Sequence, residues 1–203
     1  MSDLDLAALR TRMRAARRAL GARERIQAAE AVAQALREGL PALSRPGRIA
    51  GYWACDGELP LHPLLAGRPP FTFLLPRLMP GKRLAFAPWR PGDPIIANRY
   101  GIPEPDLAPQ RCLPPEMLDI VLTPLVAFDR AGHRLGSGGG YYDRSFAFLR
   151  ARPRPARPLL VGVGYAVQEV PALVAREWDV GLDAVVSERG MWFCRPPGDA
   201  QPM

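Results

Sequence analysis

Apolar residues recur every three or four positions along the first twenty residues of the chain, from Leu6 to Leu20. This spacing places them on one face of a helix, and Gly21 directly after them is a typical helix end. The same reasoning predicts a second helix from about residue 23 to residue 37. Residues 1–40 are therefore predicted to form an N-terminal helical pair.

Three arginines of the first predicted helix also share a face. Arg10, Arg14 and Arg17 are separated by four and three residues, so they line one side of the helix. Two interpretations fit this pattern. The face is either a solvated charged surface or a surface directed at phosphate groups, and the spacing does not choose between them.

After residue 40 the chain changes to short apolar runs separated by proline and glycine. Six of these runs have the length and the β-branched or aromatic content of strands: 48–53, 71–75, 83–87, 119–123, 159–163 and 182–186. Segments 59–66, 140–149 and 170–177 are predicted to be helical. The alternation predicts one α/β domain over residues 1–203, with a mostly parallel sheet flanked by helices. Ligands of such sheets bind beyond the carboxyl ends of the strands, where we expect the active site.

Three segments fit neither periodicity. Residues 79–106 are rich in proline and glycine, which indicates either a passive surface loop or a flap over the sheet end. Residues 152–158 alternate arginine and proline, as in an exposed connector. Residues 196–203 are predicted to be a disordered tail.

Composition narrows the class of protein. At 203 residues and 48% hydrophobic content, the chain can bury one sizeable core. No apolar run approaches the roughly 20 residues that span a bilayer, and the three cysteines are far apart. We expect a cytoplasmic, monomeric protein with free thiols and no membrane partner. The net charge of +7 is compatible with a nucleic-acid partner. However, Lys82 is the only lysine, and no basic stripe with interleaved aromatic residues accompanies the arginines. We therefore expect no nucleic-acid partner.

The candidate chemistry is concentrated in residues 129–144, which follow an apolar run. Glycines at 136, 138, 139 and 140 allow positive φ angles and a close approach of the backbone to a ligand. Backbone N–H groups that lead into a helix form an anion site. Arg134 adds a cation that pairs with phosphate, and Asp143 adds a carboxylate that suits a metal ion. The loop therefore predicts a site for nucleotide phosphates and Mg²⁺.

The context of this loop resembles the 5-formyltetrahydrofolate cyclo-ligase family, also called 5,10-methenyltetrahydrofolate synthetase. The resemblance rests first on the string Arg-Leu-Gly-Ser-Gly-Gly-Gly-Tyr-Tyr-Asp at residues 134–143. It extends to Gly57-Glu58-Leu59, to Asn98-Arg99-Tyr100-Gly101-Ile102-Pro103-Glu104-Pro105, and to Gln168, Pro171 and Trp178-Asp179. These blocks fall in the family's order and cover about residues 9–187.

The resemblance implies ATP-dependent closure of 5-formyltetrahydrofolate to 5,10-methenyltetrahydrofolate, with ADP and phosphate released. It implies Arg134 and Tyr141 as catalytic residues, and Asp143 and Asp179 as Mg²⁺ ligands. It implies an ATP site of Arg10, Arg14, Arg134, Leu135, Gly136, Ser137, Gly138, Gly139, Gly140, Tyr141 and Tyr142. It implies a folate site of Trp53, Glu58, Ser137, Gly138, Gly139, Gly140 and Tyr141. The implied partners are these small molecules alone.

Other interpretations of these residues stay open. Asp143 could cap its helix, Asp179 could close a turn, Trp53 could be a core residue, and Glu58 could be a surface acid in a first helical turn. Leu6 departs from the family, which often has a basic residue there for the nucleotide. Neither histidine has a nucleophile or carboxylate at a telling spacing, so both are expected to be loop residues. The alternative functions are a relative acting on another substrate, and a nucleotide-, folate- or RNA-binding protein that is not an enzyme.

Overall fold

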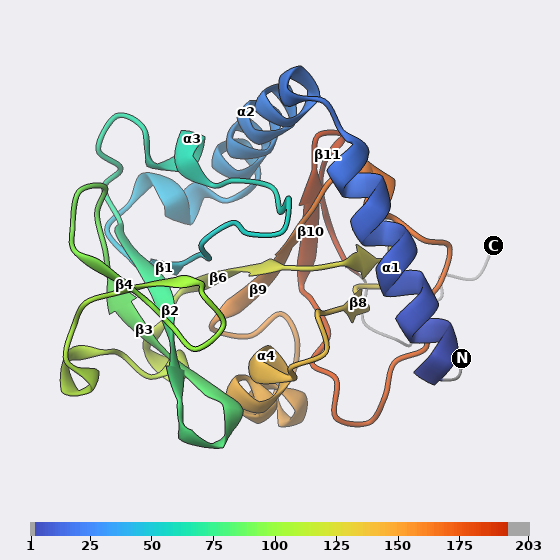
Figure 1. Ribbon diagram of the computed structural model, residues 1–203. Helices are drawn as coiled ribbons and strands as arrows, with labels where there is room; N and C mark the ends of the chain where they lie inside the picture. Colours follow the sequence, from blue (N-terminus) through green and yellow to red (C-terminus); the bar gives the residue numbers. More distant parts are fainter. Residues whose placement is uncertain (1–2, 195–203) are drawn as a thin grey trace.

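The computed structural model describes residues 3–194, and its centre is a seven-stranded sheet (Figure 1). Five central strands run parallel, and one antiparallel strand closes each edge. From edge to edge the strands are β11 (Gly190–Phe193), β10 (Ala184–Ser187), β9 (Leu159–Val163), β6 (Ile120–Pro124), β1 (Arg48–Ala50), β2 (Thr72–Met79) and β3 (Arg83–Pro88). The predicted α/β domain with a mostly parallel sheet is confirmed.

The remaining elements surround this sheet. The α-helices are α1 (Asp3–Ala19), α2 (Ala22–Gly39), α3 (His62–Leu65) and α4 (Tyr141–Ser145). Two small hairpins pair β4 (Ile95–Ala97) with β5 (Pro103–Pro105), and β7 (Ala127–Phe128) with β8 (Arg134–Leu135). Short 3-10 turns occupy Pro41–Ser44, Pro80–Lys82, Pro109–Arg111, Pro115–Met117, Ala147–Ala151 and Ala166–Gln168.

The central strands are apolar on both faces, as strand β6 illustrates. Ile120 and Leu122 belong to the core on one side of the sheet, whereas Val121 belongs to the core on the other side. Parallel strands are covered on both faces, so each side chain meets an apolar neighbour whichever way it points. The continuous apolar runs that identified these strands in the sequence are the direct consequence.

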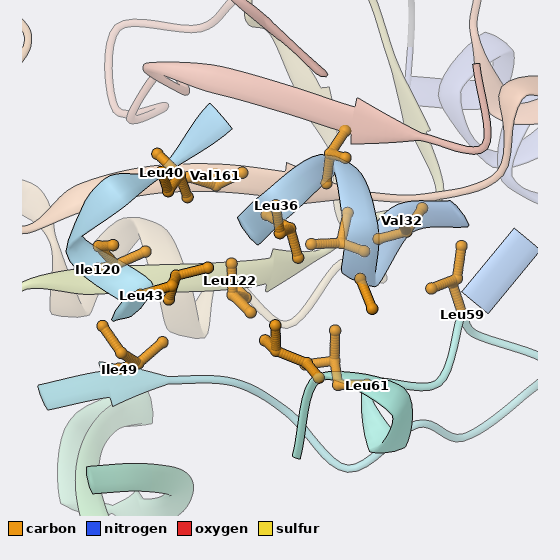
Figure 2. Close-up of a cluster of buried hydrophobic side chains, with 14 of the residues drawn as sticks. Val32, Leu36, Leu40, Leu43, Ile49, Leu59, Leu61, Ile120, Leu122 and Val161 are labelled. Atoms are coloured by element: carbon orange, nitrogen blue, oxygen red, sulfur yellow. The ribbon is translucent and has the colours of Figure 1, made fainter. Parts of the chain in front are cut away.

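Helix α2 covers one face of the sheet. Its side chains Val32 and Leu36 are buried against residues from β1, β6 and β9, as Figure 2 shows. Removing a side chain of this size from water stabilises the fold by about 1.5–3 kcal/mol. On the opposite face, Phe146 and Leu149 from the end of α4 and the turn after it are fully buried against Val121 and its neighbours.

Helices α1 and α2 correspond to the predicted N-terminal helical pair, but the apolar stripe of α1 packs against elements outside the seven-stranded sheet. Leu6, Leu9 and Met13 form a separate cluster with residues of the β7–β8 hairpin and with Leu173. The helix therefore lies beside β8, at one end of the sheet (Figure 1). The pattern of apolar residues predicted the helix and its buried face correctly, and the fold decided what covers that face.

Residues 79–106 are more ordered than a passive loop. The segment contains strand β3 and the β4–β5 hairpin, in which Ile96 pairs with Glu104. The Glu104 carboxylate is buried and accepts hydrogen bonds of 2.9 Å from the backbone N–H of Leu78 and from the Asn98 side chain. One buried acid therefore ties the hairpin to the end of β2.

Three helix predictions need correction. Segment 170–177 is not helical, because the backbone N–H of Val170 donates to Phe128 and that of Leu173 donates to the Asp129 carboxylate, which draws the segment along the β7–β8 hairpin. Segment 59–66 is helical only in α3, and 140–149 is divided between α4 and a 3-10 turn. The predicted tail at 196–203 lies outside the described residues. Across residues 3–194, no helix combines the length and apolar character needed to cross a membrane.

Candidate active site

One cavity of ≈ 1290 Å³ lies at the carboxyl ends of β1, β2 and β6. Its walls come from α1, from the chain after β1, from the β2–β3 turn, from the β4–β5 hairpin, from residues 133–144 and from residues 173–181. Of the predicted site residues, all but Arg14 line this cavity. The fold thus brings together residues that are up to about 170 positions apart in the chain, where the rule for parallel sheets places ligands.

The glycine loop, defined here as residues 136–140, forms the turn between β8 and α4. Gly138 has φ 104° and Gly140 has φ 66°, both in the region that favours glycine. A side chain at Gly140 would bring its Cβ within 2.5 Å of an Arg144 nitrogen. Helix α4 has only five residues, so its dipole contributes little, and anion binding here depends on the loop amides and on nearby arginines.

Two arginines hold carbonyl groups of the glycine loop. The Nε of Arg10, from α1, donates to the Gly136 carbonyl at 2.9 Å. The guanidinium of Arg144, from α4, donates to the Gly139 carbonyl at 2.9 Å. Both side chains also line the cavity, so they place positive charge at both ends of the loop.

Arg134 and Asp143 form an ion pair across the base of the loop. Arg134 Nη2 lies 2.6 Å from Asp143 Oδ1, and its Nη1 donates to the Val180 carbonyl. The backbone N–H of Val180 donates to the same Oδ1 at 3.2 Å. The interpretation of Asp143 as a helix cap is wrong, because the N-cap position of α4 is Gly140. The pair joins the glycine loop to the segment that carries Asp179.

Asp179 lines the cavity and also closes a turn. Its Oδ2 accepts a hydrogen bond of 2.9 Å from the backbone N–H of Arg176, as the turn interpretation anticipated. Within residues 3–194, no group of three or more His, Cys, Asp or Glu side chains converges as a protein-only metal site would. Two cavity carboxylates and few other protein ligands fit Mg²⁺, which keeps several waters when it binds with a phosphate substrate.

Glu58 belongs to a tight turn, the Glu58 turn, which comprises residues 55–58 after β1. Glu58 precedes α3 by several residues, so it is not in the first turn of a helix. One of its carboxylate oxygens accepts from the backbone N–H of Cys55 at 3.2 Å. Burial raises the pKa of Glu58 above its ordinary value, opposed in part by that hydrogen bond and by the charge of Arg17. The Cys55 thiol is also perturbed: burial, then the Glu58 charge, raises its pKa to about 11, which leaves it protonated and unreactive at neutral pH.

Trp53 precedes the Glu58 turn and serves two purposes. Its ring meets that of Trp89 edge to face, with centroids 5.6 Å apart, and it packs against the main core. It also lines the cavity. The core interpretation and the ligand-contact interpretation of Trp53 are therefore compatible.

The two adjacent tyrosines have different surroundings. The hydroxyl of Tyr141 contacts Arg99 and lies 3.0 Å from the hydroxyl of Tyr100, both at the tip of the β4–β5 hairpin. The hydrogen bond to Tyr100, then that from Arg99, lowers the pKa of Tyr141. The Tyr142 hydroxyl is buried without a hydrogen-bond partner among the described residues, and burial, then the Glu58 charge, raises its pKa. Both tyrosines line the cavity.

The arginine face of α1 is neither solvated nor wholly directed at phosphates. Arg10 lines the cavity, but Arg14 does not, and its Nε lies 3.3 Å from Asp56 Oδ2. Arg17 is fully buried and also binds Asp56. Leu6, in the position where the family often has a base, is buried in the α1 cluster and borders the cavity with apolar surface.

Several cavity residues had no role in the sequence interpretation. They are Lys82, Arg83, Tyr100, Arg144, Arg150 and Arg176. The cavity lining contains seven Lys or Arg side chains and four Asp or Glu side chains. This excess of three positive charges suits a polyanionic ligand. Tyr100 and Arg144 lie in blocks that the sequence had singled out for chemistry, whereas the other basic residues carried no spacing signal that could have identified them.

His133 lies in a loop, as expected, but it has an acidic partner that its spacing in the sequence did not indicate. Its Nδ1 lies 2.9 Å from the Asp129 carboxylate, because the β7–β8 hairpin folds residue 133 back onto residue 129. Asp129 is buried and also accepts from the backbone N–H groups of His133 and Leu173. The aspartate therefore organises the hairpin.

Comparisons with known proteins identify the family of the chain. A family model described as the 5-formyltetrahydrofolate cyclo-ligase family matches residues 5–188. The 5-formyltetrahydrofolate cyclo-ligase of Haemophilus influenzae is 37% identical over 179 residues, which cover 86% of this chain and 92% of the relative. The enzyme of that name from Escherichia coli K12 is 37% identical over 150 residues, covering 71% and 79%.

Solved structures give the same result. The NMR structure of Aquifex aeolicus 5,10-methenyltetrahydrofolate synthetase has a TM-score of 0.78 and 28% identity, with 97% of this chain and 96% of that chain covered. A 5,10-methenyltetrahydrofolate synthetase from Mycoplasma pneumoniae has a TM-score of 0.68 and 25% identity, covering 91% and 99%. The resemblance inferred from residues 134–143 and the accompanying blocks is confirmed, and the chain belongs to the 5-formyltetrahydrofolate cyclo-ligase family.

Proposed function

We propose that this protein is a ligase that uses ATP to close 5-formyltetrahydrofolate to 5,10-methenyltetrahydrofolate, with release of ADP and phosphate. Family membership over residues 5–188 supports the reaction. The observation that carries the proposal for this chain is that Glu58, Trp53 and the glycine loop, which are distant in sequence, line one cavity.

The chemistry of the reaction explains why such a cavity is needed. A formyl oxygen is a poor leaving group, so the γ-phosphoryl group of ATP is transferred to it first. N10 of the folate then attacks the activated carbon, loses its proton and expels phosphate as the ring closes. In phosphoryl transfer, a protein contributes mainly by positioning the reactants and neutralising charge. The basic excess of the cavity supplies the second requirement.

The nucleotide half of the site is assigned to the glycine loop and its arginines. We propose that the loop amides and Arg134 hold the ATP phosphates, with Arg10 supporting the loop from α1. Arg14 contributes indirectly at most, because it is bound to Asp56 outside the cavity lining. Leu135 and Tyr142 lie beside these groups and shape the same wall.

Magnesium is proposed at Asp143 and Asp179. Both carboxylates line the cavity and would hold the ion. Asp143 also contacts Arg134 and Val180, and Asp179 also accepts a hydrogen bond from the backbone N–H of Arg176. A Mg²⁺ ion bound with the nucleotide would neutralise charge that develops on the phosphoryl oxygens.

The folate half is assigned to the Glu58 side. The Glu58 carboxylate can accept hydrogen bonds from the N–H groups of the pterin, while Trp53 provides apolar surface. Tyr141 can stack on a flat ring, and its contacts with Arg99 and Tyr100 place the hairpin tip over the same region. Ser137 and the three glycines that follow it would separate folate from nucleotide.

The decisive experiment combines purified protein with ATP, Mg²⁺ and 5-formyltetrahydrofolate and follows the near-ultraviolet absorbance of the methenyl product. Absorbance should grow with enzyme concentration and require ATP. A rate equal to that of the no-enzyme control would refute the proposal and favour a relative that acts on another substrate.

We also propose a monomer in the cytoplasm: the three cysteines are unpaired, as in a reducing compartment. Size-exclusion chromatography with light scattering tests the monomer.

A further inference from the structure

Within residues 3–194, Arg17 is the least exposed charged residue, with a relative exposure of 0%. All three of its guanidinium nitrogens have acceptors. Nε donates to the Asp56 carbonyl at 2.9 Å, Nη2 to Asp56 Oδ2 at 2.8 Å, and Nη1 to the Leu125 carbonyl at 3.3 Å. A buried charge is tolerated only where it is paired and hydrogen-bonded in this way. Helix α1 is thereby bound to the Glu58 turn, about 39 positions further along the chain.

The Glu58 turn needs such support because its backbone is strained. Asp56 has φ 51° and Gly57 has φ 76°; aspartate tolerates this left-handed region better than most residues, but at a higher cost than glycine. Within the turn, the backbone N–H of Glu58 donates to the Cys55 carbonyl at 2.9 Å, and the Glu58 carboxylate accepts from Cys55 N–H at 3.2 Å. Arg17 donates hydrogen bonds to both the carbonyl and the carboxylate of Asp56. It therefore holds in place the residue whose backbone conformation sets the orientation of the Glu58 side chain.

Two other arginines also reach Asp56, but from different environments. Arg14 lies 3.3 Å away, and Arg18 forms an ion pair with the second oxygen while its own side chain is 62% exposed. Burial alone would raise the pKa of Asp56, yet Arg18 and Arg17 together hold it below its ordinary value. An exposed ion pair contributes little, so Arg17 is the member of this set that matters most for the turn.

Arg17 also acts on Glu58 through its charge. The titratable or charged groups that influence Glu58 are Arg17, Cys55, Asp56, Tyr52 and Tyr142. Among these groups Arg17 is the cation, and it favours the ionised carboxylate that burial disfavours. Asp56 acts in the opposite direction, since its negative charge favours protonated Glu58. The two partners in one ion pair thus have opposite effects on the same acid.

We propose that Arg17 is a positioning residue for folate binding: by binding both the carbonyl and the carboxylate of Asp56, it directs the Glu58 carboxylate into the cavity. The inference rests on the proposed function in that Glu58 is taken as the pterin contact. Arg17 does not line the cavity, so it acts only through the Glu58 turn.

The test compares Arg17→Met with Arg18→Met, which removes the exposed cation from the same aspartate. KM for 5-formyltetrahydrofolate and for ATP, and the pH dependence of each, are measured by the absorbance assay. In Arg17→Met the folate KM at neutral pH should rise about tenfold or more, as expected when a hydrogen-bonded charged group is displaced. The ATP KM should stay within about twofold of wild type, as should both constants in Arg18→Met.

The pH profile separates this role from simple damage to the fold. Folate KM should rise as the pH falls through the raised pKa of Glu58, because the protonated acid no longer accepts hydrogen bonds from the pterin. In Arg17→Met this rise should begin at a higher pH than in wild type. In Asp56→Asn, which keeps a side chain that tolerates positive φ, it should begin at a lower pH. Structural damage would move both variants in the same direction, which would overturn the proposal.

Asp56→Asn also keeps the proposal testable if Arg17→Met fails to fold, since an unchanged or raised onset in Asp56→Asn would contradict it. Equal increases of the folate and ATP KM in Arg17→Met would likewise contradict it. The failure of the proposed function looks different, because wild-type protein would then give no methenyl product. In that event the same pH shifts are sought in the binding of 5-formyltetrahydrofolate, followed by tryptophan fluorescence, and the absence of binding would remove both proposals.

Discussion

The glycine loop and the Glu58 turn face the same cavity, but their conformations have different origins. The loop obtains its positive φ angles from glycines at the positions that need them, Gly138 and Gly140. The turn places a non-glycine residue, Asp56, in that region and depends on Arg17 from α1 to hold it there. One region is determined by local residue choice, whereas the other is determined by a buried ion pair across the fold. Mutations should therefore affect them differently.

The largest effect is expected for Arg134→Ala on the loop side. The change removes the charge that we propose binds phosphate and also leaves Asp143 without its ion-pair partner. Losing one such preorganised electrostatic contact typically lowers the rate by about 10²–10³-fold, and we expect kcat/KM to fall by this amount. Steady-state kinetics measure it, with Arg111→Ala, an exposed arginine outside the cavity, as the control. A tenfold or smaller loss would show that the loop binds phosphate without this side chain.

Asp143→Asn should have the next largest effect. The amide keeps the shape of the carboxylate but lacks the charge that Mg²⁺ requires, so the Mg²⁺ concentration for half-maximal rate should rise by about 10–100-fold. Titration of Mg²⁺ at saturating ATP measures this. Asp93→Asn, at an exposed aspartate that does not line the cavity, serves as the matched control. Equal Mg²⁺ requirements in the two variants would remove Asp143 from the metal site.

On the turn side, Glu58→Gln should raise the folate KM by about tenfold, because a hydrogen bond to a charged group is replaced by a weaker one. The ATP KM should change little. Wild-type affinity for folate should be present above the raised pKa of Glu58 and be lost as the pH falls through it, whereas the glutamine variant should show no such dependence. Initial rates from acidic to neutral pH test both statements. Equal effects on folate and ATP would argue against a pterin contact.

The smallest effect is expected for Gly140→Ala. At φ 66° the new side chain costs about 1 kcal/mol of stability, and its Cβ displaces the flexible end of Arg144 from a distance of 2.5 Å. Gly67→Ala, at φ 76° with open space around it, should lose similar stability. Thermal unfolding compares the two, and only Gly140→Ala should raise the ATP KM, by a few-fold. Identical kinetics in both variants would show that the exact shape of the glycine loop is unimportant.

The parts of the fold that were predictable are those in which local pattern and final environment agree. Strand β6 begins with the apolar run Ile120–Leu122 because both faces of a parallel strand are buried, and the periodicity of α2 matches the face that it buries. Segment 170–177 was predicted wrongly because hydrogen bonds to Phe128 and Asp129 outweigh its weak helical pattern. The β4–β5 hairpin escaped prediction because buried Glu104, a residue that composition would place in a loop, anchors it.

The same division applies to the site. Residues 134–143, together with the accompanying blocks, resembled the family closely enough to identify it from the sequence, and the comparisons confirm the family. The assignment of this loop to the nucleotide stays a prediction. Helix periodicity could show that Arg10, Arg14 and Arg17 share a face but not what the face meets. Only the tertiary structure decided that Arg10 reaches the loop while Arg17 is buried on Asp56. The physical reason is that backbone conformation follows from local sterics, whereas the partner of a buried charge is chosen by the packing of the whole chain.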